Sequence, residues 1–272
     1  MRELQGRVAV VTGGASGIGR ACAVAMARHG AQVVIADVNE ERTAETLAEI
    51  EAFGGRARGF DCDVSRDGQV ERLAERVLGE MGGVDLLMNN AGVVLGGPME
   101  KIPMADWEWI VNINLLGPVR CLRAFLPQMI ERGSGYIVNT ASFAGLVAHN
   151  PLTIPYDTTK HGVVGLSAGL ALYLRPKGIG VSVLCPGYVE TNLSEHYRFR
   201  GMDGVGVGPA RMPDAVVTAE DVAEKVIAAV EAERFLILSQ PEHARIWARR
   251  AQDIDAHIER QLQALTGQQP AN

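Results

Sequence analysis

The chain has 272 residues, 47% of them hydrophobic and 21% charged, which is ordinary for a globular protein with a sizeable core. This length is long for one average domain, but single α/β domains often reach it. The formal net charge of −6, with no basic cluster, argues against nucleic acid as a partner.

Short apolar runs alternate with stretches of helix-like periodicity along the chain. Most of the runs are apolar throughout, as expected for parallel strands that are covered on both faces. The alternation predicts a Rossmann-like α/β fold, a doubly wound, mainly parallel seven-stranded sheet between two helical layers, in one domain of residues 1–272. The predicted strands are 7–11, 31–36, 55–60, 84–88, 135–139, 181–185 and 235–239, and the predicted helices are 17–29, 39–52, 66–80, 105–131, 156–174 and 219–232.

Two regions do not follow this alternation. Residues 192–217 contain "GMDGVGVGP", which is too rich in glycine for a stable element, and we expect this segment to be a substrate lid. Residues 241–265 read as one long, charged helix, and residues 266–272 as a frayed tail.

The four cysteines, at 22, 62, 121 and 185, lie far apart and show no spacing typical of a metal site or of a disulfide framework. We therefore expect reduced thiols, no metal and a cytoplasmic protein. The N-terminus lacks the apolar core of a signal peptide, and no stretch approaches the roughly 20 apolar residues of a transmembrane helix. We expect no membrane partner.

A glycine-rich turn, "VVTGGASGIGR" at residues 10–20, joins the first predicted strand to the first predicted helix. Gly13, Gly17 and Gly19 have the spacing GxxxGxG, and glycines let a backbone turn tightly and approach a pyrophosphate at a helix N-terminus. The context of strand, turn and helix favours a dinucleotide site. The alternative is a tight turn that binds nothing.

Asp37 ends the second predicted strand, where an acidic residue can bind the adenosine ribose. Its carboxylate would repel a 2′-phosphate, and no Lys or Arg lies within 13–19 to offset that repulsion. The sequence therefore favours NAD(H) over NADP(H). Asp37 can instead, or in addition, cap the helix that begins near Asn39.

The stretch "PYDTTKHG" places Tyr156 four residues before Lys160, so both side chains share one face of a helix. The pair alone is compatible with a tyrosine in the core and a lysine that reaches solvent. Taken alone, the pair favours that core explanation, and only the other motifs of the chain together make an acid/base pair the better interpretation.

The motifs "TGGASGIG" (12–19), "NNAG" (89–92), Tyr156-x-x-x-Lys160 and "CPGYVET" (185–191) resemble those of the short-chain dehydrogenase/reductase family. They span residues 7–239 in the family's order, each at the C-terminal end of a predicted strand. The resemblance implies an oxidoreductase that acts on CH–OH groups with a nicotinamide cofactor, as a dimer or tetramer.

The resemblance also implies a role for each matching residue. The catalytic set is Asn114, Ser142, Tyr156 and Lys160, and Phe143 and Tyr188 join Ser142 and Tyr156 as substrate contacts. Asn90 can also be a turn residue, Ser142 an ordinary turn serine, and Asn112 competes with Asn114. The implied cofactor set is Gly13, Ser16, Gly17, Ile18, Gly19, Asp37, Asp63, Val64, Asn90, Ala91, Gly92, Tyr156, Lys160, Pro186, Gly187, Val189 and Thr191.

The sequence departs from the family pattern near the tyrosine. Thr158 and Thr159 replace the usual alanine and serine, and Ser142 lies one residue further from Tyr156 than is usual. We expect the loop "HNPLTIP" at 149–155 to bulge so that the two hydroxyls can meet.

A free tyrosine titrates near pH 10, so it is a poor base at neutral pH. A lysine ammonium within about 4–6 Å favours the phenolate, and we expect Lys160 to lower the pKa of Tyr156 toward the working pH. Ser142 would donate to the substrate oxygen.

The residues expected around the substrate are mainly apolar, which favours a small to medium hydrophobic alcohol, ketone or aldehyde. Arg198, Arg200 and Arg211 can instead bind an anionic substrate or lie in solvent. An epimerase or dehydratase on the same fold, and a cofactor sensor without turnover, are the alternatives. The expected lining residues are Val93 to Gly97, Phe143, His149, Leu152, Tyr188, Leu193, His196, Tyr197 and Phe199.

Overall fold

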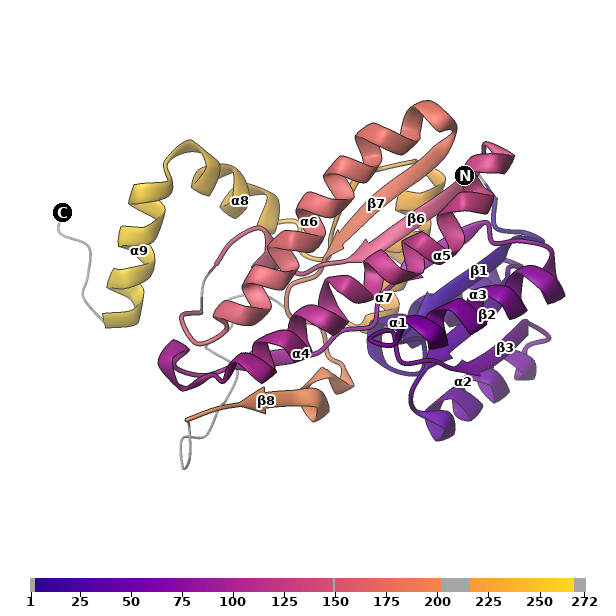
Figure 1. The fold of residues 1–272 in the computed structure, drawn as a ribbon. Helices are drawn as coiled ribbons and strands as arrows, with labels where there is room; N and C mark the ends of the chain where they lie inside the picture. Colours follow the sequence, from indigo (N-terminus) through magenta and orange to yellow (C-terminus); the bar gives the residue numbers. More distant parts are fainter. Residues whose placement is uncertain (1–2, 149, 202–215, 267–272) are drawn as a thin grey trace.

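The computed structural model describes residues 3–148, 150–201 and 216–266 (Figure 1). Within them, seven parallel strands form one sheet in the order β3-β2-β1-β4-β6-β7-β9, which confirms the predicted fold class. The strands are β1 (Val8–Thr12), β2 (Gln32–Asp37), β3 (Arg56–Asp61), β4 (Leu86–Asn89), β6 (Gly135–Thr140), β7 (Ile179–Cys185) and β9 (Leu236–Leu238).

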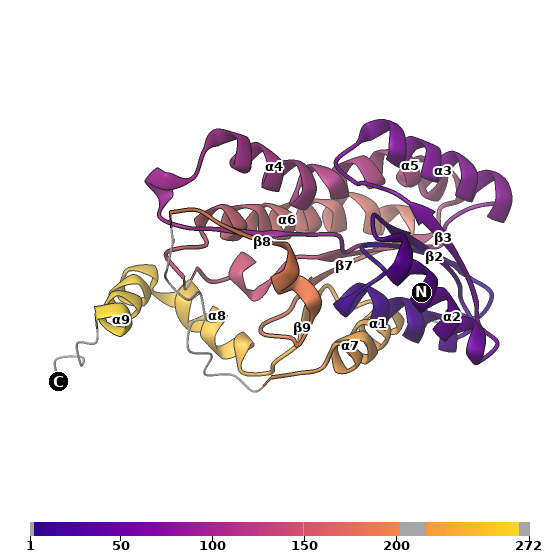
Figure 2. The same cartoon turned by 90° about the horizontal axis from the view of Figure 1, so that it is seen from below.

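Helices cover both faces of the sheet, with α1, α2 and α7 on one face and α3, α5 and α6 on the other (Figure 2). Alternate strand residues supply the two cores: Val11 packs with α1 and α7, whereas Val10 packs with α3 and α5. These helices are α1 (Gly17–Arg28), α2 (Glu40–Ala52), α3 (Asp67–Met81), α5 (Leu116–Arg132), α6 (Ile154–Leu174) and α7 (Ala219–Glu231).

The stretch predicted as one helix over 105–131 consists of two, α4 (Met104–Asn114) and α5, which meet at Leu115. Pro118 explains the break, because proline has no N–H to donate to the Asn114 carbonyl four residues earlier and its ring clashes with that carbonyl. The Asn114 carbonyl is thus left without its usual donor four residues later.

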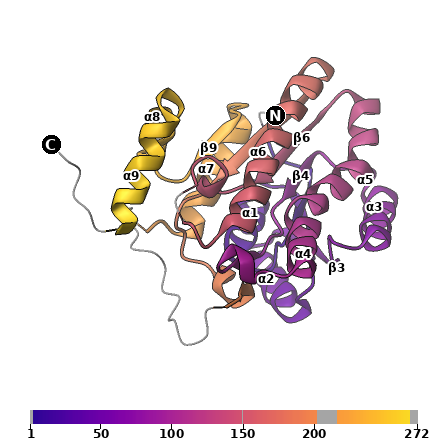
Figure 3. The same ribbon diagram turned by 60° about the vertical axis from the view of Figure 1, so that its left-hand side comes forward.

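The prediction of one helix over 241–265 is wrong. The segment forms α8 (His243–Gln252) and α9 (Ile254–Thr266), which lie at one end of the molecule (Figure 3). Asp253 has an extended backbone, with φ −154° and ψ 98°, and its Oδ1 accepts from the Ala256 N–H at 2.8 Å. Asp253 thus acts as an N-cap, and it starts α9 inside a stretch whose helix-like periodicity does not show the break. Residues 267–272, most of the predicted tail, lie outside the described residues.

Part of the predicted lid forms a strand that the sequence analysis missed. β8 (Tyr197–Phe199) pairs with β5 (Val94–Gly96) as a small parallel sheet, separate from the main one. Residues 202–215, which hold the glycine run and Arg211, lie outside the described residues.

Asp106 anchors this small sheet to α4. It is 5% exposed and pairs with Arg200 and, at 3.3 Å, with Arg198, whose guanidinium also stacks 3.6 Å from the Trp109 ring. Hydrogen bonds from Arg200 hold the pKa of the Asp106 carboxyl below its usual value. Both arginines thus bind Asp106 within the protein. The sequence alone did not decide whether they would bind substrate or lie in solvent.

Cys22, Cys62, Cys121 and Cys185 are free and buried. No helix within the described residues is long and apolar enough to cross a membrane. In the same part of the chain, no three His, Cys, Asp or Glu side chains gather as metal ligands.

Candidate active site

The glycine turn between β1 and α1 comes unusually close to its neighbours. Gly13 has φ +62°, and a Cβ there would lie 2.8 Å from the Ala91 Cα. Gly17 has φ +50°, and its Cβ would lie 3.0 Å from Thr191. Ser16 occupies the N-cap of α1 without a side-chain capping bond. The turn therefore offers free backbone N–H groups and a hydroxyl at a helix N-terminus, which fits a pyrophosphate.

Asn90 and Gly19 hold this turn in place. The Asn90 Nδ2 donates to the Gly13 carbonyl at 3.1 Å, and its backbone N–H donates to the Thr12 hydroxyl at 3.0 Å. A Cβ on Gly19 would lie only 2.0 Å from the Gly13 oxygen. Asn90 thus holds the glycine turn by hydrogen bonds, and it also lines the cavity beside that turn.

Asp37 bonds the glycine turn with one carboxylate oxygen and its own loop with the other: Oδ2 accepts from the Ala15 N–H and Oδ1 from the Asn39 N–H, each at 3.0 Å. The cap of α2 is Asn39, whose side chain accepts from the Arg42 N–H at 3.0 Å. Asn39, and not Asp37, is therefore the residue that caps α2. Arg42, which the sequence analysis did not consider, lies by Asp37 and pairs with Glu195 at 2.8 Å.

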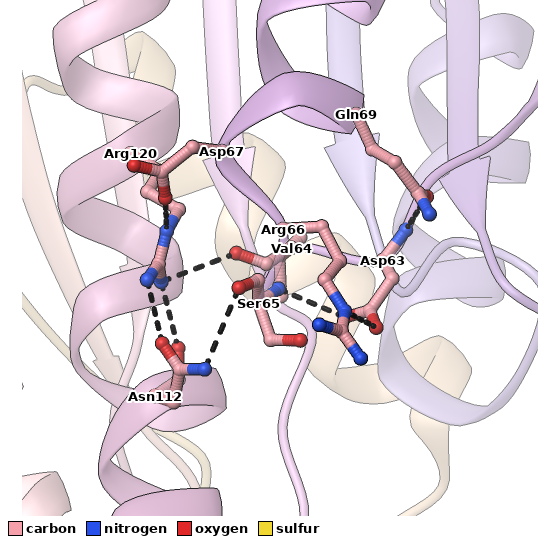
Figure 4. A network of polar contacts seen from close by, with 8 residues as sticks. All are labelled: Asp63, Val64, Ser65, Arg66, Asp67, Gln69, Asn112 and Arg120. Carbon is pink, nitrogen blue, oxygen red and sulfur yellow. Dashed lines mark hydrogen bonds and ion pairs between the residues drawn. The ribbon is translucent and has the colours of Figure 1, made fainter.

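The loop after β3, which carries Asp63 and Val64, is held by a polar network (Figure 4). The Asp63 N–H donates to the Gln69 side chain at 2.7 Å, and its carboxylate accepts from the Ser65 N–H at 2.8 Å. Asn112 donates to the Ser65 carbonyl at 3.4 Å and accepts from Arg120 at 2.6 Å. Of the two asparagines in α4, Asn112 thus belongs to this loop.

Asn114 faces the opposite side of α4 and is 1% exposed. Its Oδ1 accepts from the Val93 N–H and its Nδ2 donates to the Val93 carbonyl, both at 2.9 Å. Nδ2 also donates to the Thr159 hydroxyl at 3.2 Å, which in turn donates to the Tyr156 carbonyl at 2.8 Å. Asn114 and Thr159 thereby tie the start of β5 to the turn of α6 that carries Tyr156 and Lys160.

Lys160, Tyr156 and Ser142 lie together. The Lys160 ammonium donates to the Thr140 carbonyl at 3.0 Å and lies 5.6 Å from the centre of the Tyr156 ring. The Ser142 hydroxyl accepts from the Ala144 N–H at 3.1 Å and lies near enough to the Tyr156 phenol to lower the pKa of that phenol. Within the longer loop before Tyr156, His149 lies outside the described residues.

The electrostatics differ from the expectation that Lys160 lowers the pKa of Tyr156. Burial raises the pKa of the Tyr156 phenol above its ordinary value, and the hydrogen bond from Ser142 offsets this only in part. The same burial lowers the pKa of Lys160 to about 8. Desolvation disfavours both charged forms at once, so in the protein alone it outweighs the attraction between them.

A cavity of about 230 Å³ joins the glycine turn to this cluster. Gly19, Asn114, Ser142, Phe143, Gly187, Tyr188 and Val189 are predicted residues that do not line it. The sequence analysis missed seven lining residues, and all of them except Thr140 are adjacent in the chain to a predicted position: Ala36, Val38, Cys62, Ile113, Thr140, Ala141 and Asn192. Predicted residues that line it are Gly13, Ser16, Gly17, Ile18, Asp37, Asp63, Val64, Asn90, Ala91, Gly92, Val93, Tyr156, Lys160, Pro186, Thr191 and Leu193.

Three of the predicted substrate residues, Phe143, Tyr197 and Phe199, make ring contacts within the protein. Phe143 is buried and stacks on His243, with ring centres 3.8 Å apart, so it packs against the C-terminal segment. Tyr197 and Phe199 of β8 contact each other edge to face, with ring centres 5.7 Å apart.

Residues 7–199 match the family described as short chain dehydrogenase. The 1-deoxy-11-beta-hydroxypentalenate dehydrogenase of Streptomyces exfoliatus is 36% identical over 261 residues, which are 94% of this chain and 91% of that protein. The D-threitol dehydrogenase of Mycolicibacterium smegmatis is 37% identical over 223 residues, which are 80% of this chain and 85% of that protein.

Solved structures show the same likeness. A short-chain dehydrogenase/reductase from Burkholderia phymatum, in complex with NAD, superposes with a TM-score of 0.84 at 33% identity. The alignment covers 100% of this chain and 99% of that one.

The Asp157→Asn variant tests the burial of the carboxyl beside Tyr156. Asp157 is 6% exposed, and burial raises its pKa to about 7, while the Thr153 hydroxyl donates to it at 3.0 Å. The folded protein therefore holds a proton that the unfolded chain releases, and stability falls as pH rises from about 4 to above 7. The variant should be more stable than the wild type by about 1–3 kcal/mol at pH 8, measured by denaturant unfolding.

Near pH 4 this difference should disappear. The exposed Asp61→Asn serves as the control and should show no such pH dependence. A stabilisation of the same size at both pH values would contradict the assignment.

Proposed function

The chain belongs to the short-chain dehydrogenase/reductase family of oxidoreductases, and we propose that it uses NAD(H) to interconvert a secondary alcohol and the corresponding ketone. The substrate class is a small to medium hydrophobic molecule. The observation that carries the proposal is the shared cavity: one wall is the glycine turn with Asp37, and another is Tyr156 with Lys160.

The cavity fits a dinucleotide laid across the carboxyl ends of the strands. The turn at Gly13 to Gly17 and the N-terminus of α1 would hold the pyrophosphate, and Asp37 the adenosine ribose. Asp63 and Val64 would contact the adenine. Lys160 would reach the second ribose, and the loop after β7 would hold the nicotinamide end.

The nicotinamide, when bound, supplies or accepts a hydride. During alcohol oxidation Tyr156, as the phenolate, takes the hydroxyl proton, and during carbonyl reduction the phenol returns it to the oxygen. Ser142 donates a hydrogen bond to that oxygen and orients the carbon. Since burial opposes the phenolate, the positive charges of Lys160 and of oxidised nicotinamide must together offset the desolvation of Tyr156.

Three observations support NAD(H) over NADP(H). Asp37 faces the cavity at the ribose end. The nearby cation, Arg42, is already paired with Glu195 and so is less able to neutralise a 2′-phosphate. The similar structure from Burkholderia phymatum holds NAD.

The substrate class rests on the apolar groups near the catalytic cluster. Val93, Ile113 and Leu193 line the same cavity as Tyr156, and Leu95, Ile110 and Trp107 pack with Tyr156 in a small core beside it. The relatives named as dehydrogenases of a hydroxypentalenate and of D-threitol support an alcohol as the substrate.

Replacing Tyr156 with Phe should lower kcat by at least about 100-fold, because a positioned general acid/base contributes roughly 10²–10⁴-fold. Binding of NADH should change less than a few-fold. The assay follows reduced-nicotinamide absorbance with a panel of alcohols and ketones, together with a fluorescence titration of NADH.

Tyr173→Phe is the matched control, because it removes a phenol hydroxyl that is exposed on the same helix. It should leave kcat unchanged. Wild-type turnover in the Tyr156 variant would refute its role, and turnover without net oxidation or reduction of the cofactor would indicate an epimerase or dehydratase.

Replacing Asp37 with Ala should raise the Kd for NADH by about tenfold or more, because a hydrogen bond to a charged group is lost. The Kd for NADPH should change less, since a repulsive charge is removed together with the contact. The ratio of the two constants is the readout, because a general loss of loop structure would affect both cofactors.

Asp61→Ala, at the exposed end of the neighbouring strand, is the control and should keep the wild-type ratio. An unchanged ratio in the Asp37 variant, or tighter NADPH binding by the wild type, would exclude the preference for NAD(H).

We also propose that the chain is a homo-oligomer, because apolar side chains are exposed on neighbouring helices. Met104 of α4 is 71% exposed, Leu116 of α5 41% and Leu172 of α6 82%. The wild type should have the mass of two or four chains by light scattering, and Leu172→Glu should lower it. Leu262→Glu on α9 is the control, and a monomeric wild type would contradict the proposal.

A further inference from the structure

A buried polar segment follows β9, and the proposed chemistry does not use it. Ser239 and His243 are 0% exposed, and Gln240 is 1% exposed. Polar side chains this deeply buried must be matched by hydrogen bonds. Their partners identify what the segment does.

The Gln240 side chain clamps the loop that follows β7. Its Oε1 accepts from the Gly187 N–H at 3.2 Å, and its Nε2 donates to the Tyr188 carbonyl at 3.0 Å. The Ser239 hydroxyl accepts from the same Gly187 N–H at 2.9 Å and donates to Gln240 Oε1. One amide side chain thus binds the Gly187 N–H and the Tyr188 carbonyl, which belong to the peptide units before and after the Gly187–Tyr188 peptide.

His243 closes the other side of this loop. A Cβ on Gly187 would lie 2.2 Å from the His243 ring and 2.6 Å from Gln240 Oε1, so only glycine allows the loop to lie so close. His243 stacks on Phe143, whose N–H donates to the Pro186 carbonyl at 2.8 Å. Phe143 follows Ser142 directly, so the segment contacts both the loop after β7 and the loop that carries Ser142.

We propose that Gln240 is a positioning residue for the nicotinamide half of the cofactor, an inference that rests on the proposed function. The residues it clamps adjoin Pro186 and precede Val189 and Thr191. These are the positions expected to hold the nicotinamide end.

The adenosine end does not depend on this clamp. Asp37 and Asp63 follow β2 and β3, on the far side of β1 from β7 in the sheet order. Loss of the clamp should therefore weaken contacts to the nicotinamide and leave contacts to ADP-ribose intact. If Gln240 had only a general structural role, its loss would weaken the contacts to the nicotinamide and to ADP-ribose alike.

The experiment compares Gln240→Leu with the wild type, because leucine keeps most of the side-chain volume and removes both hydrogen bonds. The Kd for NADH should rise by about tenfold and kcat should fall by about tenfold, while the Kd for ADP-ribose stays within about twofold. Gln128→Leu is the control. It loses a side-chain bond to the Val84 carbonyl, which precedes the amino end of β4, and it should leave all three constants unchanged.

Gln240→Glu supplies a readout that does not depend on the leucine variant. A protonated glutamic acid can accept from the Gly187 N–H and donate to the Tyr188 carbonyl, whereas the carboxylate can only accept. The variant's Kd for NADH, divided by its Kd for ADP-ribose, should therefore fall toward the wild-type ratio as pH decreases from 8 to 5.5. The wild-type ratio over the same range supplies the reference.

The outcomes separate this inference from the proposed function. If the wild type binds neither NADH nor ADP-ribose, the proposed function is wrong and the inference falls with it. If the wild type binds both and Gln240→Leu weakens both equally, or neither, the positioning role alone is overturned. A Gln240→Glu ratio that does not follow pH would overturn it as well.

Discussion

Parallel pairing between strands brings the ends of separate strands to one edge of the sheet. Thr12 pairs with Asn89, and Asn89 with Asn139, so the segments after β1, β4 and β6 begin side by side. Each segment can then bond its neighbour, as when Asn90 donates to the Gly13 carbonyl. The cavity exists because these segments turn at the same level, and it would be lost if any one strand shifted in register.

Desolvation and charge oppose each other at the proposed catalytic cluster of Tyr156 and Lys160. The low-dielectric surroundings that raise the pKa of Tyr156 also lower the pKa of Lys160. A cationic cofactor beside the phenol would shift this balance toward the phenolate, so the acid/base group would become active when the cofactor is in place. Asn114 and Thr159 contribute to orientation, because they fix the backbone on both sides of the cluster.

Segments outside the recognised motifs hold the motif loops in position. Gln240 and His243 contact the loop after β7, and Asp106 holds β8 next to β5 through Arg198 and Arg200. These contacts join residues far apart in the chain, and no local pattern indicates them. The substrate end of the proposed site is therefore held by contacts between segments that lie far apart in the chain.

The sequence by itself determined the strand and helix alternation, the seven-stranded parallel sheet and the position of the glycine turn. Apolar periodicity and glycine spacing are local properties, which can be read without coordinates. It did not resolve the roles of Asn112 and Asn114 or of Asp37 and Asn39, and it missed β5, β8 and the cap at Asp253. Only the tertiary structure decided these, since each depends on which distant backbone group a short polar side chain can reach. The pKa of Tyr156 belongs to the same group, because burial is a property of the folded chain and not of residue spacing.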